Sequence, residues 1–282
     1  MINPTTISEQ LLFSTVRLEA QTEGNPVSVG TGFFFDFRVD QEKIIPVILT
    51  NKHVVENTSM GRFYLHESEL SNNIPKPSGK FFSITMDNFS QRWIPHPTLD
   101  LCAMLFQPLR VEAEKQKKQI FNRPLEDSLI PTDASLEALN AVEDVLMVGY
   151  PTGLWDSKNN LPLIRRGITA THPAIDFCGQ SLSVIDIACF PGSSGSPVLL
   201  VNEGMYGTKT GTVVGNRVFL LGTLHAGPQM NAQGEIDIRD IPTTSKAFTN
   251  TQVMINLGYV IKAKEIKVLG EIIKKNVLGA NP

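Results

Sequence analysis

The stretch Phe-Pro-Gly-Ser-Ser-Gly-Ser-Pro, residues 190–197, decides how the fold of this chain is interpreted. It lies between two apolar runs, residues 182–188 and 198–201, which are typical of strands, so the octet is predicted to be a tight loop. Its glycines permit positive φ and a close approach of other backbone, and its prolines fix φ. A serine in such a loop can point its hydroxyl into a cleft. The amides of Gly192 and Ser194 can then converge on one point, as an oxyanion hole requires.

The length and composition indicate an ordinary globular protein. The chain has 282 residues, a formal net charge of −3, 41% hydrophobic and 19% charged residues. This length allows one large domain or two small ones. The balanced charge gives no sign of a nucleic-acid groove or a membrane-surface patch, so neither partner is expected. We find no apolar run of about 18 residues and no secretory signal, and we therefore expect a cytoplasmic protein.

The cysteines and histidines do not form a recognisable ligand set. The three cysteines, at positions 102, 178 and 189, are odd in number and contain no C-x-x-C pair. This argues against a disulfide framework and a structural zinc site. The five histidines show no H-E-x-x-H spacing. We expect no metal and no cofactor.

A histidine follows the second strand of a predicted hairpin. Residues 27–37 and 44–50 are strand-like and are separated by a polar turn. His53 comes directly after the second run, and imidazole titrates near neutrality, so His53 is a candidate general base. The alternative is a structural histidine with no catalytic part.

A single carboxylate, Asp100, lies in the otherwise apolar run at residues 93–106. A buried charge is costly unless it is paired, and the N–H of an imidazole would satisfy it. The same bond would fix the tautomer of the imidazole. The alternative is an N-cap or turn aspartate at the start of a strand. His96, between two prolines, is interpreted as a loop histidine.

Four segments together resemble the chymotrypsin-like serine proteases, and in particular trypsin-like bacterial enzymes of the HtrA type. They are Gly-x-Gly-Phe at 30–33, Leu-Thr-x-x-His-Val-Val at 49–55, Asp-Leu-x-x-x-Leu at 100–105 and Gly-x-Ser-Gly-x-Pro at 192–197. The similarity extends over about residues 27–275, and it is to a stand-alone protease domain without a PDZ domain.

This resemblance implies a serine endopeptidase that cleaves peptide bonds through an acyl-enzyme intermediate. It assigns the catalytic triad to His53, Asp100 and Ser194, in the chain order of chymotrypsin, and the oxyanion hole to the amides of Gly192 and Ser194. The substrate would be a protein or peptide.

The resemblance also implies an all-β fold of two six-stranded antiparallel β-barrels, with the active site in the cleft between them and a C-terminal α-helix on the second barrel. We expect four parts. They are an N-terminal barrel at 1–106, a partly helical linker at 107–143, a C-terminal barrel at 144–261, and a helix and tail at 262–282. Residues 1–10 are predicted to be a loose arm, and residues 71–80 and 227–251 are predicted to be polar loops.

The substrate pocket for the P1 side chain, S1, is assigned to Ala188, His225 and Gly227. Ala188 carries no negative charge, so Arg or Lys at P1 is disfavoured. An imidazole can donate to a carboxylate or amide, so His225 favours an acidic or amide P1 if it lies in the pocket. In the most direct register it lies beside the pocket, which leaves a small apolar P1 as the alternative.

Two other kinds of function remain open. A latent module would become active only with an activating protein partner, and a non-catalytic module would use the same barrels as a binding surface. An esterase with the same triad is a further alternative. Turnover of peptides against esters separates it from a peptidase.

Overall fold

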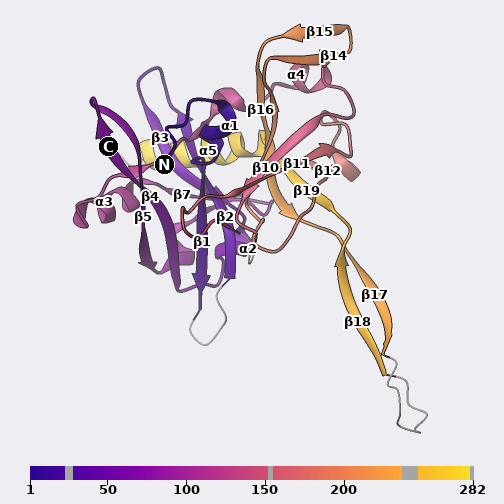
Figure 1. Cartoon of the computed structure of the whole chain (residues 1–282), viewed down its shortest axis with the longest axis horizontal. Coiled ribbons are helices and arrows are strands. Elements are labelled where there is room, and N and C mark those ends of the chain that lie inside the picture. Colours follow the sequence, from indigo (N-terminus) through magenta and orange to yellow (C-terminus); the bar gives the residue numbers. More distant parts are fainter. Residues whose placement is uncertain (23–27, 152–154, 237–246, 280–282) are drawn as a thin grey trace.

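Figure 1 shows the computed structural model of the chain, which describes residues 1–22, 28–151, 155–236 and 247–279. Strands dominate it, and they form two main units joined by short helices. The all-β class and the C-terminal helix are confirmed. Among the described residues, no helix has both the length and the apolar character needed to cross a membrane.

The first unit is a single sheet of nine strands rather than a six-stranded barrel. Its strand order is β5-β4-β1-β2-β3-β7-β6, with β8 on β4 and β9 on β2. The extra strands β8 and β9 come from the predicted linker, where short apolar runs reach free strand edges. The strands are β1 Thr15–Gln21, β2 Ser28–Arg38, β3 Ile44–Thr50, β4 Met60–Ser71, β5 Ile74–Asp87, β6 Ile94–Pro95, β7 Cys102–Leu105, β8 Ile120–Phe121 and β9 Leu125–Glu126.

Two predictions for this unit are wrong. The predicted arm contains a short helix, α1 (Ile7–Leu11), because Thr6 and Glu9 form a capping box that satisfies the first amides. The predicted loop at 71–80 is the tip of a long hairpin between β4 and β5. Asn72 and Asn73 have φ of 52° and 63°, as a two-residue type I′ turn requires.

The second unit is a closed barrel of six antiparallel strands, as predicted. The order around it is β10-β11-β12-β19-β16-β13. The strands are β10 Asp144–Gly149, β11 Leu163–Thr169, β12 Leu182–Asp186, β13 Pro197–Asn202, β16 Arg217–Ala226 and β19 Leu257–Lys262.

Two ribbons project from this barrel (Figure 1). One joins β14 (Met205–Thr208) to β15 (Gly211–Val214) and leads into β16. The other joins β17 (Gln229–Ile236) to β18 (Ala247–Met254), where a polar loop was expected. The backbones of β17 and β18 pair along eight residues each, and the connecting residues 237–246 lie outside the described residues.

Helices cover the connections and one face of the units. They are α2 Lys52–Val55, α3 Gln107–Lys115, α4 Asp133–Glu137 and α5 Lys264–Leu278, with 3-10 turns η1 Phe89–Arg92, η2 Asp127–Leu129 and η3 Phe177–Gly179. The apolar face of α5 enters a core cluster that holds residues of both units. Gly270 lies so close to Phe37 that a Cβ would come within 2.6 Å of its ring. The helix thus packs on the second barrel, where it was expected, and the small residue lets it approach β2 of the first unit as well.

Candidate active site

A cleft between the two units holds the predicted serine and histidine. It has a volume of about 360 Å³. His53 reaches it from the first unit, and Ser194 from the second. The lining residues are His53, Cys189, Phe190, Pro191, Ser194, Leu224, His225, Ala226 and Gly227.

The pairing of β3 with β7 brings His53 beside Asp100. Thr50 at the end of β3 pairs with Cys102 at the start of β7, so the residues just beyond the two strands lie at one edge. His53 lies in the short helix that begins at Lys52, and its backbone N–H donates to Asp100 Oδ1 at 3.1 Å. Its ring Nδ1 donates to Asp100 Oδ2 at 2.5 Å. Asn51 holds the backbone of the aspartate through Nδ2 at 2.7 Å.

A second imidazole shares this carboxylate. His225 Nδ1 lies 3.1 Å from Asp100 Oδ2, although the two residues are 125 positions apart in the chain. Burial alone would raise the pKa of the Asp100 carboxyl, but the hydrogen bonds from His225 and His53 outweigh it and hold the pKa well below its ordinary value. Asp100 is therefore ionised at neutral pH, and it can accept a hydrogen bond from each imidazole ring.

The serine loop exposes only one of its three hydroxyls. Ser193 and Ser196 are buried, whereas Ser194 is partly exposed in the cleft. Gly192 and Gly195 have φ of 88° and 84°, a left-handed conformation that favours glycine. The amides of Gly192 and Ser194 donate to no group within the described ranges, so both are free to bind an oxygen.

No hydrogen bond joins the side chains of Ser194 and His53 within the described part of the chain. Both line the same cleft, on opposite units. In proteases without substrate, the bond between nucleophile and base is often long and shortens only when substrate is bound.

Thr31 on β2 anchors the serine loop to the first unit. Its hydroxyl donates to Gly192 O at 2.9 Å and accepts from the Tyr150 amide at 3.0 Å. Its backbone N–H donates to Ser194 O at 2.9 Å. A Cβ on Gly195 would come within 2.0 Å of Thr31 O, so the loop lies directly on this strand. The sequence analysis did not single out Thr31, although its position between Gly30 and Gly32 was a signal of close backbone approach.

Thr31→Val is expected to lower the free energy of unfolding by about 1–3 kcal/mol. Valine keeps the shape of threonine but leaves the Gly192 carbonyl and the Tyr150 amide without their partner in a buried place. Urea denaturation would measure the loss. The control is Thr85→Val, an exposed threonine on β5, for which a change within about 0.5 kcal/mol is expected. Equal stability of the two variants would contradict the anchoring role.

The predicted S1 residues lie at the cleft but differ in what they contact. Gly227 and His225 line it, and Cys189 lines it in place of its neighbour Ala188. The Ala188 carbonyl accepts a hydrogen bond from Arg165 Nη1, and the Arg165 guanidinium lies over the Phe190 ring at 4.6 Å from its centroid. Arg165 therefore braces the wall of the cleft.

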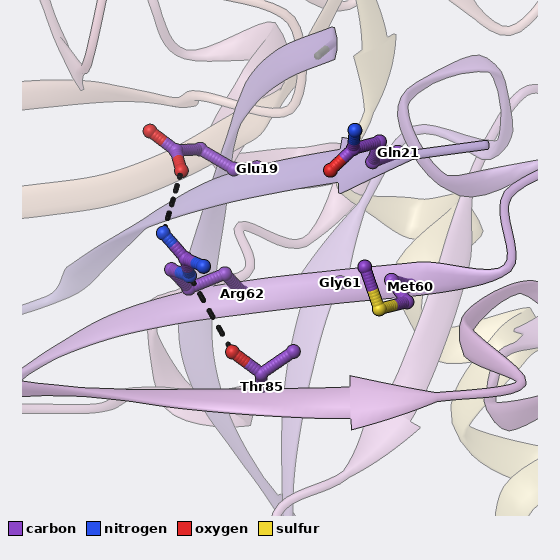
Figure 2. A pocket seen from close by; sticks show the side chains of 6 residues that line it. All are labelled: Glu19, Gln21, Met60, Gly61, Arg62 and Thr85. Atoms are coloured by element: carbon purple, nitrogen blue, oxygen red, sulfur yellow. Dashed lines mark hydrogen bonds and ion pairs between the residues drawn. The ribbon is translucent and has the colours of Figure 1, made fainter. Parts of the chain in front are cut away.

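A separate hollow of about 60 Å³ lies over β1, β4 and β5, away from the cleft (Figure 2). Its polar side chains bind one another. Arg62 lies 4.0 Å from Glu19 and donates through Nε to Thr85 Oγ1 at 3.4 Å. This hollow is small and holds no pair of groups suited to proton transfer, so we place the candidate site in the cleft.

The protein is thus an all-β protein of two units. At the cleft between them, the hydrogen-bonded pair of His53 and Asp100 lies across from Ser194 in its glycine-containing loop. The trypsin-like peptidase domain family matches residues 30–207, which is well over half of the chain. The chain belongs to this family.

Solved structures with similarity to the chain include three proteases. The active form of the Rv3671c protease from M. tuberculosis is 15% identical and has a TM-score of 0.45, with 92% of this chain and 80% of that chain covered. Tobacco vein mottling virus protease is 13% identical, with a TM-score of 0.44 and coverage of 93% and 82%. Tobacco etch virus protease complexed with product is 13% identical, with a TM-score of 0.42 and coverage of 81% and 73%. No curated protein matches the chain.

Proposed function

We propose that this protein is a serine endopeptidase with the catalytic triad His53, Asp100 and Ser194. The observation that carries the proposal is the 2.5 Å bond between His53 Nδ1 and Asp100 Oδ2 at a cleft that Ser194 also lines. An ionised carboxylate on Nδ1 keeps the proton there and leaves Nε2 free to accept one. Membership of the trypsin-like peptidase family supports a protein or peptide substrate.

The reaction would be acyl transfer in two steps. Ser194 Oγ attacks the carbonyl carbon of the scissile bond while His53 Nε2 takes its proton. The amides of Gly192 and Ser194 bind the oxyanion, and His53 returns the proton to the leaving amine. Water then attacks the acyl-enzyme with His53 again as base, which frees the new carboxyl end and Ser194.

The P1 preference follows from the contacts of His225. Its Nδ1 is directed to Asp100, so that atom does not face a P1 side chain. Gly227, and Cys189 in place of Ala188, bring no charge to the pocket. We therefore propose a small apolar P1 residue over an acidic one, and a peptide library with varied P1 tests this against both alternatives.

Labelling with a fluorophosphonate probe tests the proposed nucleophile. The folded wild-type protein is expected to become labelled on Ser194, because the probe needs an activated serine beside an oxyanion hole. Labelling is expected to fall to background in Ser194→Ala and to persist in Ser128→Ala, which removes an exposed serine that does not line the cleft. Peptide mapping by mass spectrometry would locate the modified residue.

Three other results would change the proposal. Folded wild-type protein that takes no label would mean that the isolated chain does not assemble the site, and it would favour a module that needs an activating protein partner. Label on a residue other than Ser194 would overturn the assignment of the nucleophile. Turnover of esters without peptides would indicate an esterase.

A further inference from the structure

We propose that His53, Asp100 and His225 form a binding site for a divalent transition-metal ion such as Zn²⁺, and that the bound ion switches the active site off. The binding part concerns the three side chains alone. The inhibitory part rests on the proposed serine peptidase function.

The three side chains present one ligand atom each to a common point. The ligand atoms lie within 4.8 Å of one another. The two imidazole nitrogens approach the same carboxylate oxygen, Oδ2 of Asp100, at 2.5 and 3.1 Å. The ligands come from segments 47 and 125 residues apart, so no local ligand spacing predicts this site.

The donor set fits a borderline ion better than a hard one. Two imidazole nitrogens and one carboxylate oxygen, with a water molecule in the fourth position, are typical ligands of Zn²⁺. Mg²⁺ and Ca²⁺ prefer sites built of oxygen atoms. The ionised carboxylate also supplies the negative charge that a cation needs.

Side-chain movements of about 1–1.5 Å would admit the ion. Tetrahedral Zn²⁺ has Zn–N distances of about 2.0–2.1 Å, so its ligand atoms lie about 3.3 Å apart. The His225 contact, at 3.1 Å, is close to that value. The His53 contact, at 2.5 Å, must open by less than about 1 Å, and the two imidazole ligand atoms, within 4.8 Å of each other, must approach by up to about 1.5 Å. The His53 side chain is 43% exposed and can swing outward toward solvent.

The ion would reverse the tautomer of the base. In the triad, Nδ1 of His53 carries the proton and Nε2 accepts one. An ion on Nδ1 displaces that proton, which moves to Nε2 of the same neutral ring. No proton is gained or lost, but Nε2 becomes a donor and can no longer take the proton of Ser194. The same shift occurs at His225, whose Nδ1 also binds the ion.

Binding is measured first in a protein that cannot turn over substrate. The parent is the full chain with Ser194→Ala and Cys178→Ser, without an affinity tag, since Cys178 is an exposed free thiol and thiolates are zinc ligands. Titration calorimetry with Zn²⁺ at pH 7.5 is expected to show one ion per chain. Adding His225→Asn keeps a donor for Asp100 but removes a ligand, and the affinity is expected to fall by at least about tenfold.

The matched control is His172→Asn, which changes a histidine outside the cleft and is expected to leave the affinity unchanged. His53→Gln removes a different ligand and replaces the His225 variant in this test if that variant does not fold. Absence of a one-to-one site in the parent, or equal affinity in the ligand variants and the control, would overturn the metal site.

Inhibition is measured separately on the active chain with Cys178→Ser. Zn²⁺ is expected to inhibit peptide cleavage at the concentrations that fill the site, EDTA to restore it, and Mg²⁺ to have no effect. A filled site with undiminished cleavage would overturn the switch. A chain that binds Zn²⁺ but cleaves no peptide without it would overturn the proposed function and leave the site standing.

Discussion

Asp100→Asn is expected to lower kcat/KM for peptide cleavage about 10⁴-fold while the fold persists. The asparagine side chain can present its amide nitrogen where Oδ2 stood. That nitrogen cannot accept from the Nδ1–H groups of His53 and His225. His53 would then carry its proton on Nε2, which faces the cleft, and would no longer serve as base for Ser194.

Steady-state kinetics on a fluorogenic peptide would measure this loss, with circular dichroism to establish that the variant is folded. The control is Asp87→Asn, which changes an exposed aspartate at the end of β5 and is expected to leave kcat/KM unchanged. A loss of less than tenfold in Asp100→Asn would remove Asp100 from the catalytic machinery.

Acid is expected to destabilise the protein through a histidine that takes no part in the cleft. His66 on β4 is 4% exposed, and its ring packs edge-on against Phe13 with 4.9 Å between centroids. Burial lowers the pKa of His66 to about 4, against an ordinary value of about 6.5 in the unfolded chain.

The sign follows from which state binds the proton. Between pH 6.5 and pH 4 the unfolded chain protonates this ring and the folded chain does not, so stability falls as the pH is lowered through that window. The difference of about 2.5 pKa units corresponds to a loss of about 3 kcal/mol at pH 4, relative to pH 7.

Urea denaturation of wild type and His66→Gln at pH 7 and pH 4 would measure this contribution. The glutamine side chain does not titrate, so the difference in unfolding free energy between the two proteins is expected to shift by about 3 kcal/mol in favour of the variant at pH 4. His172→Gln is the control. Parallel pH profiles of wild type and His66→Gln would show that His66 is not the group responsible.

The sequence was sufficient where a local pattern and its strand fix a position. His53 follows β3 and Asp100 precedes β7, and these strands pair directly, so two short motifs predicted a real contact. The serine loop was predicted for a similar reason, since its glycines mark positive φ at Gly192 and Gly195.

Other features depended on local signals that were given too little weight. Thr6 and Glu9 have the spacing of a capping box, and Asn72-Asn73 is a turn dipeptide, yet both segments were interpreted as irregular. The β17–β18 ribbon has a polar sequence without a clear apolar alternation, so its backbone pairing had no sequence signal of comparable strength.

The remaining features arise only when distant segments meet. Nothing near His225 in the chain indicates that its ring will reach Asp100, because that contact depends on how the barrel lies against the first sheet. The same holds for the hydroxyl of Thr31, whose partners belong to the other unit. The addition of β8 and β9 to the first sheet likewise depends on the path of the segment after Lys115.

The position of α5 has a consequence for the synthesis of the protein. Ile266, Leu269 and Ile273 complete a core cluster that also holds Phe37 and Ile45 of the first sheet. A nascent chain that has not yet released residues 264–278 from the ribosome leaves those side chains open to water. The unit that bears the Asp-His pair is thus completed only after residues 264–278 have left the ribosome, and these residues follow the serine loop in the chain.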